Sequence, residues 1–333
     1  MEKVIRIGTR ESQLAVWQAT KVQQLLLQNN FPSELVYIKS EGDIDLQTPL
    51  YEMGVQGIFT KSLDIALLTN KIDIAVHSMK DVPTQLAKGI VQAAVLERAS
   101  YKDLLVVNGE WSMVNNVVNG HWATGNEDPA AFADLSTIDH SPLTKPFTIA
   151  TSSIRRKAQW LNRFPNHTLD NLRGNVNTRL RKVAESNWQG AIFAAAGLER
   201  IGLRPEKSIE LDWMLPAPAQ GAIMVVCRED DQFCLDACSF FNDATTALCT
   251  RIERDFLKVL LGGCSMPISA LAKLAGDKII FKGNILSVDG KQKVEIDMTG
   301  PGFQARDMGI NAAHEILTKG AQKIIEGIRN AAK

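Results

Sequence analysis

Basic side chains gather in one part of the chain, between Ile154 and Lys182. This stretch contains eight arginines and lysines but a single acid, Asp170. Several of the basic residues stand at turns where a predicted strand passes into a predicted helix: Arg155 and Arg156 follow Thr151-Ser152-Ser153, and Arg179 follows Arg173-Gly174-Asn175. The free N–H groups of a helix N-terminus and the planar donors of arginine both suit carboxylates or phosphates. The pattern predicts a site for a small polyanion, although two helices with solvated basic faces would have the same composition.

The same arrangement occurs at two other turns. Arg10 and Ser12 stand where the first predicted strand, 4–8, passes into a helix, and Arg200 follows the predicted strand 190–195. In an α/β sheet such turns face one crevice at the carboxyl ends of the strands. None of them has the glycine spacing of a phosphate-binding or dinucleotide-binding loop, so nothing in the sequence supports a nucleotide ligand.

Asp81 is the acidic residue best placed to act beside such an anion site. It follows the apolar strand 72–76 in the segment Lys80-Asp81-Val82-Pro83, and so stands at the carboxyl end of a strand. A carboxylate held there can accept N–H hydrogen bonds and stabilise a developing cation. The alternative is an aspartate that only caps the turn. His77, close by, is expected to be structural, since nothing else in the sequence supports acid–base chemistry there.

Cys264 is the cysteine whose setting suits covalent chemistry. It lies in Leu-Gly-Gly-Cys-Ser-Met-Pro (261–267), where the glycines and the proline predict a loop, and a covalent link needs an accessible thiol. A lone cysteine on a loop can also be inert. The five cysteines are an odd set in a long chain, which is not a disulfide framework. Cys234 and Cys238 have no matching Cys or His pair, so we expect no metal site.

Composition narrows the class of protein. The chain has 333 residues, with 37 Lys and Arg against 37 Asp and Glu, 45% hydrophobic and 22% charged residues. These values are typical of a globular protein of two or three domains, and the zero net charge argues against a general nucleic-acid binder. No stretch reaches the roughly 18 apolar residues of a membrane span, and the N-terminus does not resemble a secretory signal. We therefore expect a cytoplasmic protein with no membrane or nucleic-acid partner.

The predicted elements that position these residues form two α/β runs. Strands alternate with helices from residue 4 to 107 and again from 147 to 195, which indicates two mostly parallel sheets. The segment 110–146 between them is polar and acidic and is predicted to be a solvated insertion. After residue 218 the pattern changes to a strand, a long helix 243–260, a hairpin around Asp289-Gly290 and a final helix, which is typical of a small α+β domain.

Six stretches of the chain form a recognisable set, which consists of Ile-Gly-Thr-Arg-Glu-Ser-Gln-Leu-Ala (7–15), Asp-Ile-Ala-Val-His-Ser-Met-Lys-Asp-Val-Pro (73–83), Thr-Ser-Ser-Ile-Arg-Arg (151–156), Leu-Arg-Gly-Asn-Val-Asn-Thr-Arg-Leu (172–180), Ala-Ala-Gly-Leu-Glu-Arg-Ile-Gly-Leu (195–203) and Gly-Gly-Cys-Ser-Met-Pro-Ile (262–268). In sequence and in order these stretches resemble the porphobilinogen deaminase (hydroxymethylbilane synthase) family of tetrapyrrole (heme) biosynthesis. The resemblance implies an α/β fold of two type-2 periplasmic-binding-protein-like domains plus a small α+β C-terminal domain. We expect domain 1 at 1–101 and 220–242, domain 2 at 102–219 and domain 3 at 243–333, in a monomer.

The resemblance also implies a transferase. Four molecules of its substrate, porphobilinogen, would be joined head to tail with loss of ammonia, and hydrolysis would release hydroxymethylbilane. A dipyrromethane cofactor would be held by a thioether to Cys264, and Asp81 would stabilise the cationic azafulvene left when ammonia departs. The residues matched to cofactor binding are Ser78, Lys80, Thr151, Ser153, Arg155, Arg156 and Arg179. Those matched to substrate binding are Arg10, Ser12, Gln18, Lys61, Arg173 and Arg200.

The chain departs from the family's pattern at three places. Gln56 stands where many members have lysine, Pro218-Ala219 precedes Gln220 where bacterial members usually have a residue and glycine, and the insertion 110–146 lengthens the second domain. Two other functions fit part of the sequence. A catalytically silent, two-lobed anion-binding protein would keep the arginines but need neither Asp81 nor Cys264. A cysteine hydrolase would need a histidine to activate that thiol, and none is placed there by the sequence.

Overall fold

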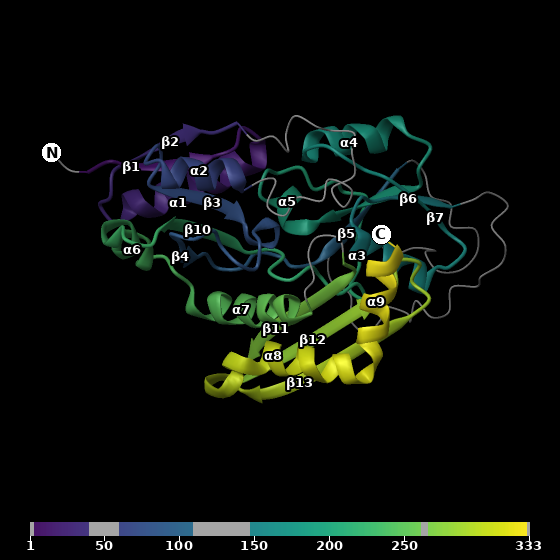
Figure 1. Ribbon diagram of the computed structural model, residues 1–333. Coiled ribbons are helices and arrows are strands. Elements are labelled where there is room, and N and C mark those ends of the chain that lie inside the picture. The colour runs from purple at the N-terminus through teal and green to yellow at the C-terminus, as the bar shows by residue number, and fades with distance from the viewer. Residues whose placement is uncertain (1–2, 40–59, 109–146, 261–265, 332–333) are drawn as a thin grey trace.

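The computed structural model describes residues 3–39, 60–108, 147–260 and 266–331. Gln56, the insertion 110–146 and Cys264 therefore lie outside the described residues. The described chain forms two five-stranded sheets with helices packed against them, and a third, smaller sheet with its own helices (Figure 1). None of the described helices has the length and apolar character needed to cross a membrane.

The first lobe is built on a sheet of strand order β2-β1-β3-β10-β4. Strand β1 pairs in parallel with β2 and β3, while β10 runs antiparallel to β3 and β4. Helices α1 and α6 pack on one face of this sheet and α2 packs on the other. The elements of the first lobe are β1 Ile5–Thr9, α1 Gln13–Gln28, β2 Ser33–Tyr37, α2 Lys61–Leu68, β3 Ile74–Ser78, β4 Ile90–Val95, β10 Ile223–Arg228 and α6 Gln232–Ser239.

Local sequence explains where these elements begin and which side they bury. Ser12 caps α1, because its hydroxyl accepts a hydrogen bond from the Ala15 N–H at 3.4 Å. Ala19, Val22 and Leu26 follow at helical spacing and form the buried face of the helix. Strands β1, β3 and β10 are buried at nearly every position because helices cover both faces of the sheet.

The second lobe repeats the topology of the first. Its sheet has the order β7-β6-β8-β5-β9, in which β6 pairs in parallel with β7 and β8, and β5 runs antiparallel to β8 and β9. The two α/β runs predicted from the sequence thus form two sheets of one design. The elements of the second lobe are β5 Asp103–Val107, β6 Thr148–Ala150, α3 Ile154–Arg163, β7 Thr168–Asp170, α4 Val176–Glu185, β8 Gly190–Ala194, α5 Ala195–Glu199 and β9 Ser208–Glu210.

The chain crosses between the lobes twice. Residues 96–102 join β4 of the first sheet to β5 of the second, and residues 211–222 join β9 back to β10. We call these two stretches the crossover segments. Gln220 ties them together, because its side-chain amide donates to the carbonyl oxygen of Tyr101 at 2.8 Å. The antiparallel strand of each sheet, β10 in the first and β5 in the second, directly follows a crossover segment that comes from the other lobe.

A third module follows, with an antiparallel sheet of order β11-β12-β13. The predicted hairpin is confirmed as β12 and β13, and Phe256 and Phe281 meet edge to face in the core at 5.2 Å between ring centroids. Gly290, in the hairpin turn, has φ +73° and lies so close to α3 that a Cβ would come within 2.5 Å of the Asn162 nitrogen. The elements of this module are α7 Ala244–Val259, β11 Ile268–Ala275, β12 Lys278–Leu286, β13 Lys293–Pro301, α8 Met308–Ile316 and α9 Gln322–Ala331.

These sheets confirm the predicted fold class of two α/β domains and a small α+β C-terminal part. The residue boundaries given for the three domains stay a prediction.

Asp73, the residue before β3, is the centre of a buried ion-pair network in the first lobe. Its carboxylate accepts hydrogen bonds from the Arg6 backbone N–H and Nε, both at 2.9 Å, and from Arg228 Nη2 at 3.1 Å. Burial by itself would raise the pKa of Asp73, but the hydrogen bonds from the two arginines lower that pKa to about 2.

We expect Asp73→Asn to remove an acid-sensitive part of the stability. A lowered pKa stabilises the folded state above the pKa of the unfolded chain, about 4, and this contribution is lost as the pH falls toward 2. The difference in unfolding free energy between wild type and Asp73→Asn should be about 2 kcal/mol larger at pH 6 than at pH 2, measured by urea unfolding. Asp230→Asn, an exposed control, should show no such change. A difference that does not vary with pH would contradict this account.

Candidate active site between the two lobes

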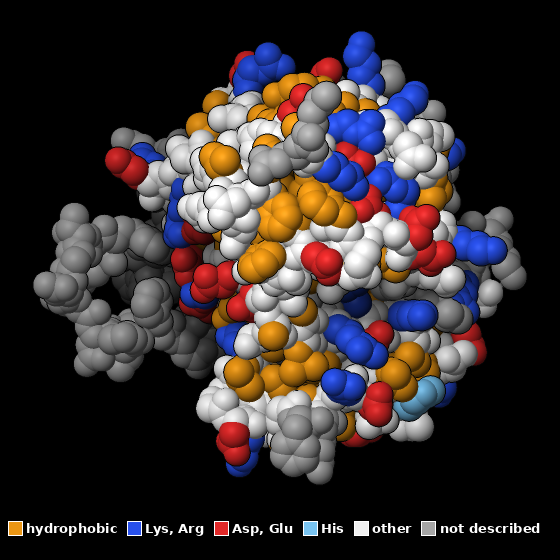
Figure 2. All heavy atoms as spheres, turned by 90° about the vertical axis from the view of Figure 1, so that its left-hand side faces the viewer, with side chains coloured by type: hydrophobic (Ala, Val, Ile, Leu, Met, Phe, Trp, Pro, Cys, Tyr) orange, Lys and Arg blue, Asp and Glu red, His pale blue; other side chains and the backbone are white. Residues whose placement is uncertain are grey.

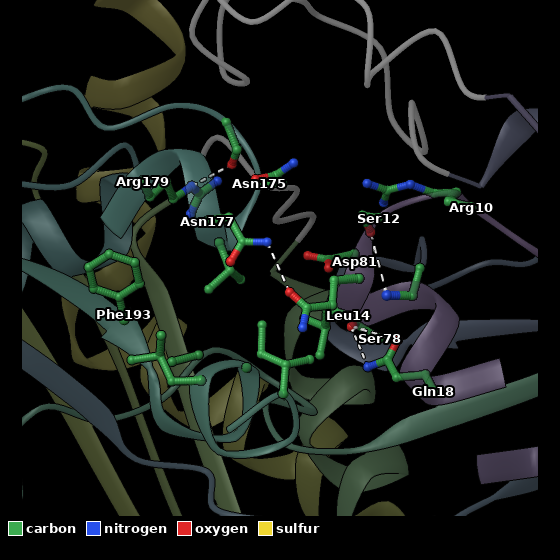
Figure 3. A pocket seen from close by; sticks show the side chains of 18 of the residues that line it. Arg10, Ser12, Leu14, Gln18, Ser78, Asp81, Asn175, Asn177, Arg179 and Phe193 are labelled. Carbon is green, nitrogen blue, oxygen red and sulfur yellow. Dashed lines mark hydrogen bonds between the residues drawn. The ribbon is translucent and has the colours of Figure 1, made fainter. Parts of the chain in front are cut away.

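A pocket lies between the two lobes and is lined from both sides (Figure 3). The first lobe contributes the N-terminal turn of α1 and the end of β3, and the second contributes the N-terminal turn of α4 and the end of β8. The polar and aromatic residues that line it are Arg10, Ser12, Gln13, Gln18, Thr60, His77, Ser78, Lys80, Asp81, Arg156, Arg173, Asn175, Asn177, Arg179 and Phe193.

On the first-lobe side, Asp81 ends a short 3-10 turn, Met79–Asp81, directly after β3. The start of this turn is held by Gln18, whose amide donates to Ser78 Oγ at 2.9 Å. Burial lowers the pKa of Lys80 to about 8, although the charge of Asp81 acts in the opposite direction. A carboxylate ligand beside this amine would favour its charged form again. His77 is buried, and burial lowers its pKa to about 4, so it is neutral at neutral pH.

On the second-lobe side, two arginines stand at the start of helices. Arg156, in the first turn of α3, donates through Nη2 to Asp103 at 2.7 Å and through Nη1 to the carbonyl oxygen of Ile192 at 2.9 Å. Arg179, in the first turn of α4, donates through Nε to the carbonyl oxygen of Gly174 at 2.7 Å. Burial lowers the pKa of Arg179 to about 10, which leaves its guanidinium charged at neutral pH.

The charges of the pocket are strongly unequal. Among the described residues that line it, five are basic and Asp81 is the one acid. The outer face of the first lobe looks different, because Lys and Arg side chains lie among Asp and Glu there (Figure 2). The zero net charge of the chain thus conceals a basic pocket, and that pocket can hold several carboxylates of one ligand.

The two lobes touch each other around the pocket. Asn177 of α4 donates through its side-chain amide to Gln13 Oε1 of α1 at 2.9 Å (Figure 3). Arg200, just after α5, donates to the carbonyl oxygen of Gly221 at 2.6 Å and stands 5.8 Å from the centre of the Trp17 ring. The lobes are therefore in direct contact beside the pocket.

Nine of the residues predicted for the site are brought together in the pocket. Five others do not line it. Arg155 is buried against Asp103, at 2.8 Å, and the carbonyl oxygen of Leu215, at 2.7 Å. Ser153 caps α3, Thr151 is buried beneath that cap, Arg200 contacts a crossover segment and Lys61 is exposed at the start of α2. The nine in the pocket are Arg10, Ser12, Gln18, Ser78, Lys80, Asp81, Arg156, Arg173 and Arg179.

Asp103 is a residue that the sequence reasoning missed. It is fully buried at the start of β5, and it accepts hydrogen bonds from Arg155, Arg156 and Gln220. Burial by itself would raise its pKa, but the two guanidinium groups lower the pKa of Asp103 to about 2. A signal was present in the sequence, because an acid at the start of an apolar strand needs a partner when it is buried.

We expect Asp103→Asn to lower the unfolding free energy by about 1.5–3 kcal/mol, because the amide cannot replace charge-assisted hydrogen bonds to two buried arginines. Urea unfolding measures this loss. The matched control is Asp212→Asn, whose carboxylate is 64% exposed and pairs with Lys102, and its effect should stay below about 1 kcal/mol. Equal losses of unfolding free energy in the two variants would show that the buried ion pairs of Asp103 add no stability beyond that of an exposed pair.

Two α/β lobes of one topology are joined by two crossover segments and line one pocket. The family model described as "Porphobilinogen deaminase, dipyromethane cofactor binding domain" matches residues 5–236, and the one described as "Porphobilinogen deaminase, C-terminal domain" matches residues 247–318. The chain belongs to the porphobilinogen deaminase family.

Relatives and solved structures resemble the chain to different degrees. The porphobilinogen deaminase of Geobacter metallireducens is 38% identical over 97% of this chain and 94% of its own length. That of Geobacter sulfurreducens is 38% identical over 96% of this chain and 93% of its own. A nutrient-binding protein from Burkholderia cenocepacia bound to methionine is 13% identical over 73% of this chain and 93% of that chain, with a TM-score of 0.40.

Proposed function

We propose that this chain joins four porphobilinogen molecules head to tail, releasing ammonia at each addition, and frees the product as hydroxymethylbilane. The observation that carries this proposal is the pocket itself, which is lined, among the described residues, by five basic side chains and one aspartate in a chain of the porphobilinogen deaminase family. Each porphobilinogen carries an acetate and a propionate, so both the substrate and the growing chain are polyanions.

The pocket suits a dipyrromethane cofactor. Such a group has four carboxylates, and the basic side chains that line the pocket provide positively charged hydrogen-bond donors for them. Ser78, Lys80, Arg156 and Arg179 would hold these carboxylates, and the thiol of Cys264 would form the thioether. When bound, dipyrromethane supplies the pyrrole end to which the new chain is attached. Two of the five N–H groups of Arg156 remain for a ligand, after the three bonds to Asp103 and Ile192.

Asp81 is proposed as the catalytic residue. Loss of ammonia from the aminomethyl group of porphobilinogen develops positive charge on its pyrrole ring. The carboxylate of Asp81, which lines the pocket, would accept the pyrrole N–H and stabilise that charge. The other charged side chains of the described pocket lining are basic, so the Asp81 carboxylate is the group that can bind the positive centre of an otherwise anionic substrate.

The remaining pocket residues would bind the incoming substrate. Arg10, Ser12, Gln18 and Arg173 line the pocket and are proposed to hold the acetate and propionate of porphobilinogen. Arg200 and Lys61 remain proposed substrate contacts, although neither lines the pocket here. Thr151, Ser153 and Arg155 remain proposed cofactor residues, and their present contacts support an indirect part through the first turn of α3.

We further propose that the protein is a monomer of the cytoplasm, with no nucleic-acid or membrane partner. The four described cysteines, all of them free and buried, support a reducing compartment. The division into domains at 1–101 with 220–242, 102–219 and 243–333 is supported by the way the strands are distributed among three sheets.

The test of the proposed function is incubation of the purified protein with porphobilinogen. We expect four molecules of ammonia for each hydroxymethylbilane formed, measured by an ammonia assay and by mass spectrometry of the product. Binding of porphobilinogen without release of ammonia would instead identify a silent anion-binding protein, which is the alternative that the arginines alone would allow.

A further inference from the structure

The turn that carries Asp81 separates two hollows of the molecule. On one side, Lys80 and Asp81 line the pocket between the lobes. On the other side, Met79 lines a groove between the first lobe and helix α7 of the third module. The position of the Asp81 carboxylate in the pocket therefore depends on the contacts that the turn makes on the side of the groove.

Arg254 of α7 reaches across that groove to the turn. Its Nη1 donates to the carbonyl oxygen of Val82 at 2.8 Å and to that of Met79 at 3.3 Å, and its Nη2 donates to that of Pro83 at 2.5 Å. The residue is only 9% exposed. Burial lowers the pKa of Arg254 to about 10, so it stays charged at neutral pH, and a charged donor makes stronger hydrogen bonds than a neutral one.

The rest of the turn shows why these carbonyl contacts matter. The start of the turn is tied to the first sheet, because the Met79 N–H donates to the carbonyl oxygen of Ala222 at 3.0 Å. At the far end Pro83 has no N–H, and the Val82 N–H bonds within the turn to Met79 at 3.2 Å. The far end of the turn can therefore be held by a neighbouring element through its carbonyl groups, and Arg254 donates hydrogen bonds to those of Val82 and Pro83.

We propose that Arg254 is a positioning residue for Asp81, because its guanidinium fixes the backbone both before and after that aspartate. The proposal rests on the proposed function of Asp81. A displacement of about 1 Å at a reacting group can cost about 100-fold in rate, so a residue that never touches substrate can still control turnover. Helix α7 ends at Val259, shortly before Cys264 in the chain, so the element that fixes the turn also precedes the proposed cofactor thiol.

The first test compares Arg254→Gln with a matched control on the same helix. Arg251, one turn earlier, is 63% exposed and pairs with Asp255, so Arg251→Gln should behave as the wild type. We expect Arg254→Gln to lower kcat about 10-fold to 100-fold per cofactor-loaded molecule, with KM for porphobilinogen within about twofold. The loaded fraction is counted by intact mass. Unchanged kcat in the loaded Arg254→Gln protein would overturn the proposal.

A double-mutant cycle separates positioning from a general loss of structure. If Arg254 acts through Asp81, the change Arg254→Gln should cost little in a protein that already carries Asp81→Asn. Equal fold losses in the presence and absence of the Asp81 carboxylate would overturn the proposal. Should Arg254→Gln fail to fold, the same cycle with Arg254→Lys decides, since lysine keeps the charge but not the fork of donors.

Hydrogen exchange of the turn gives a readout that needs no activity. A peptide covering residues 77–86 should exchange faster in Arg254→Gln than in wild type or Arg251→Gln, because the turn has lost its rear support. Unchanged exchange would mean that Arg254 does not hold the turn. A wild type that forms no hydroxymethylbilane would instead remove the proposed function, and the exchange result would still decide what Arg254 does to the backbone.

Discussion

Asp81→Asn is expected to lower turnover about 10²-fold to 10³-fold, because removal of a single fixed electrostatic stabiliser has that cost in other enzymes. The amide keeps the shape and one acceptor oxygen of the side chain but loses the negative charge. The charged residues that line the described part of the pocket would then be five basic side chains and no acid. A cationic substrate centre would have no counter-charge there, while the carboxylates of the substrate would still be bound. The loss should therefore fall on kcat rather than on KM.

Single-turnover measurement of ammonia release is the direct readout for this variant. Asp81→Glu is the matched comparison, since it keeps the charge and moves it by one methylene, and it should retain more activity than Asp81→Asn. Because cofactor assembly uses the same chemistry, rates must be divided by the cofactor-loaded fraction found by intact mass. Near-normal release by loaded Asp81→Asn would remove Asp81 from the mechanism.

Cys264→Ser is expected to abolish covalent cofactor attachment altogether. Protein purified from cells that make porphobilinogen should exceed the mass of its polypeptide by one dipyrromethane, and the serine variant should show no excess. A hydroxyl group is a much weaker nucleophile than a thiolate, so it would not form the corresponding ether. Turnover should fall with the cofactor, to the limit of detection.

The matched control for this variant is Cys249→Ala. Cys249 is buried in the third module, and burial raises the pKa of its thiol to about 11, so it is not nucleophilic at neutral pH. The mass excess should survive in this variant. A wild-type protein of unmodified mass with full activity would refute covalent attachment.

The α/β character of the fold could be predicted from local patterns, but the strand order could not. Apolar strands alternating with amphipathic helices identify both runs. Pairing of β10 between β3 and β4 joins residues that are far apart in the chain, which no local pattern reports. Strand β9 and helix α6 are only three and eight residues long, too short for a clear period.

The pocket could be predicted in part because turns at the carboxyl ends of strands converge. Arg10, Asp81 and Arg179 were found in this way. The adjacent pair Arg155 and Arg156 shows the limit of such reasoning. Successive residues of a helix point about 100° apart, so Arg156 lines the pocket while Arg155 donates to the carbonyl oxygen of Leu215, although both guanidinium groups bind Asp103. The part played by Arg254 had no sequence signal, because its partners are backbone carbonyl groups of a distant turn.

The two crossings between the lobes also fix the order in which the newly made chain can fold. All five strands of the second sheet lie between residues 103 and 210, so that sheet can pair as soon as this stretch is synthesised. The first sheet must wait for β10, which begins 128 positions after the end of β4. At ribosomal rates this delay is on the order of 10 s, during which β3 and β4 keep unpaired edges that can aggregate. The lobe that starts the chain is therefore the later of the two to be completed, and a nascent chain ending before residue 228 is the form most in need of a chaperone.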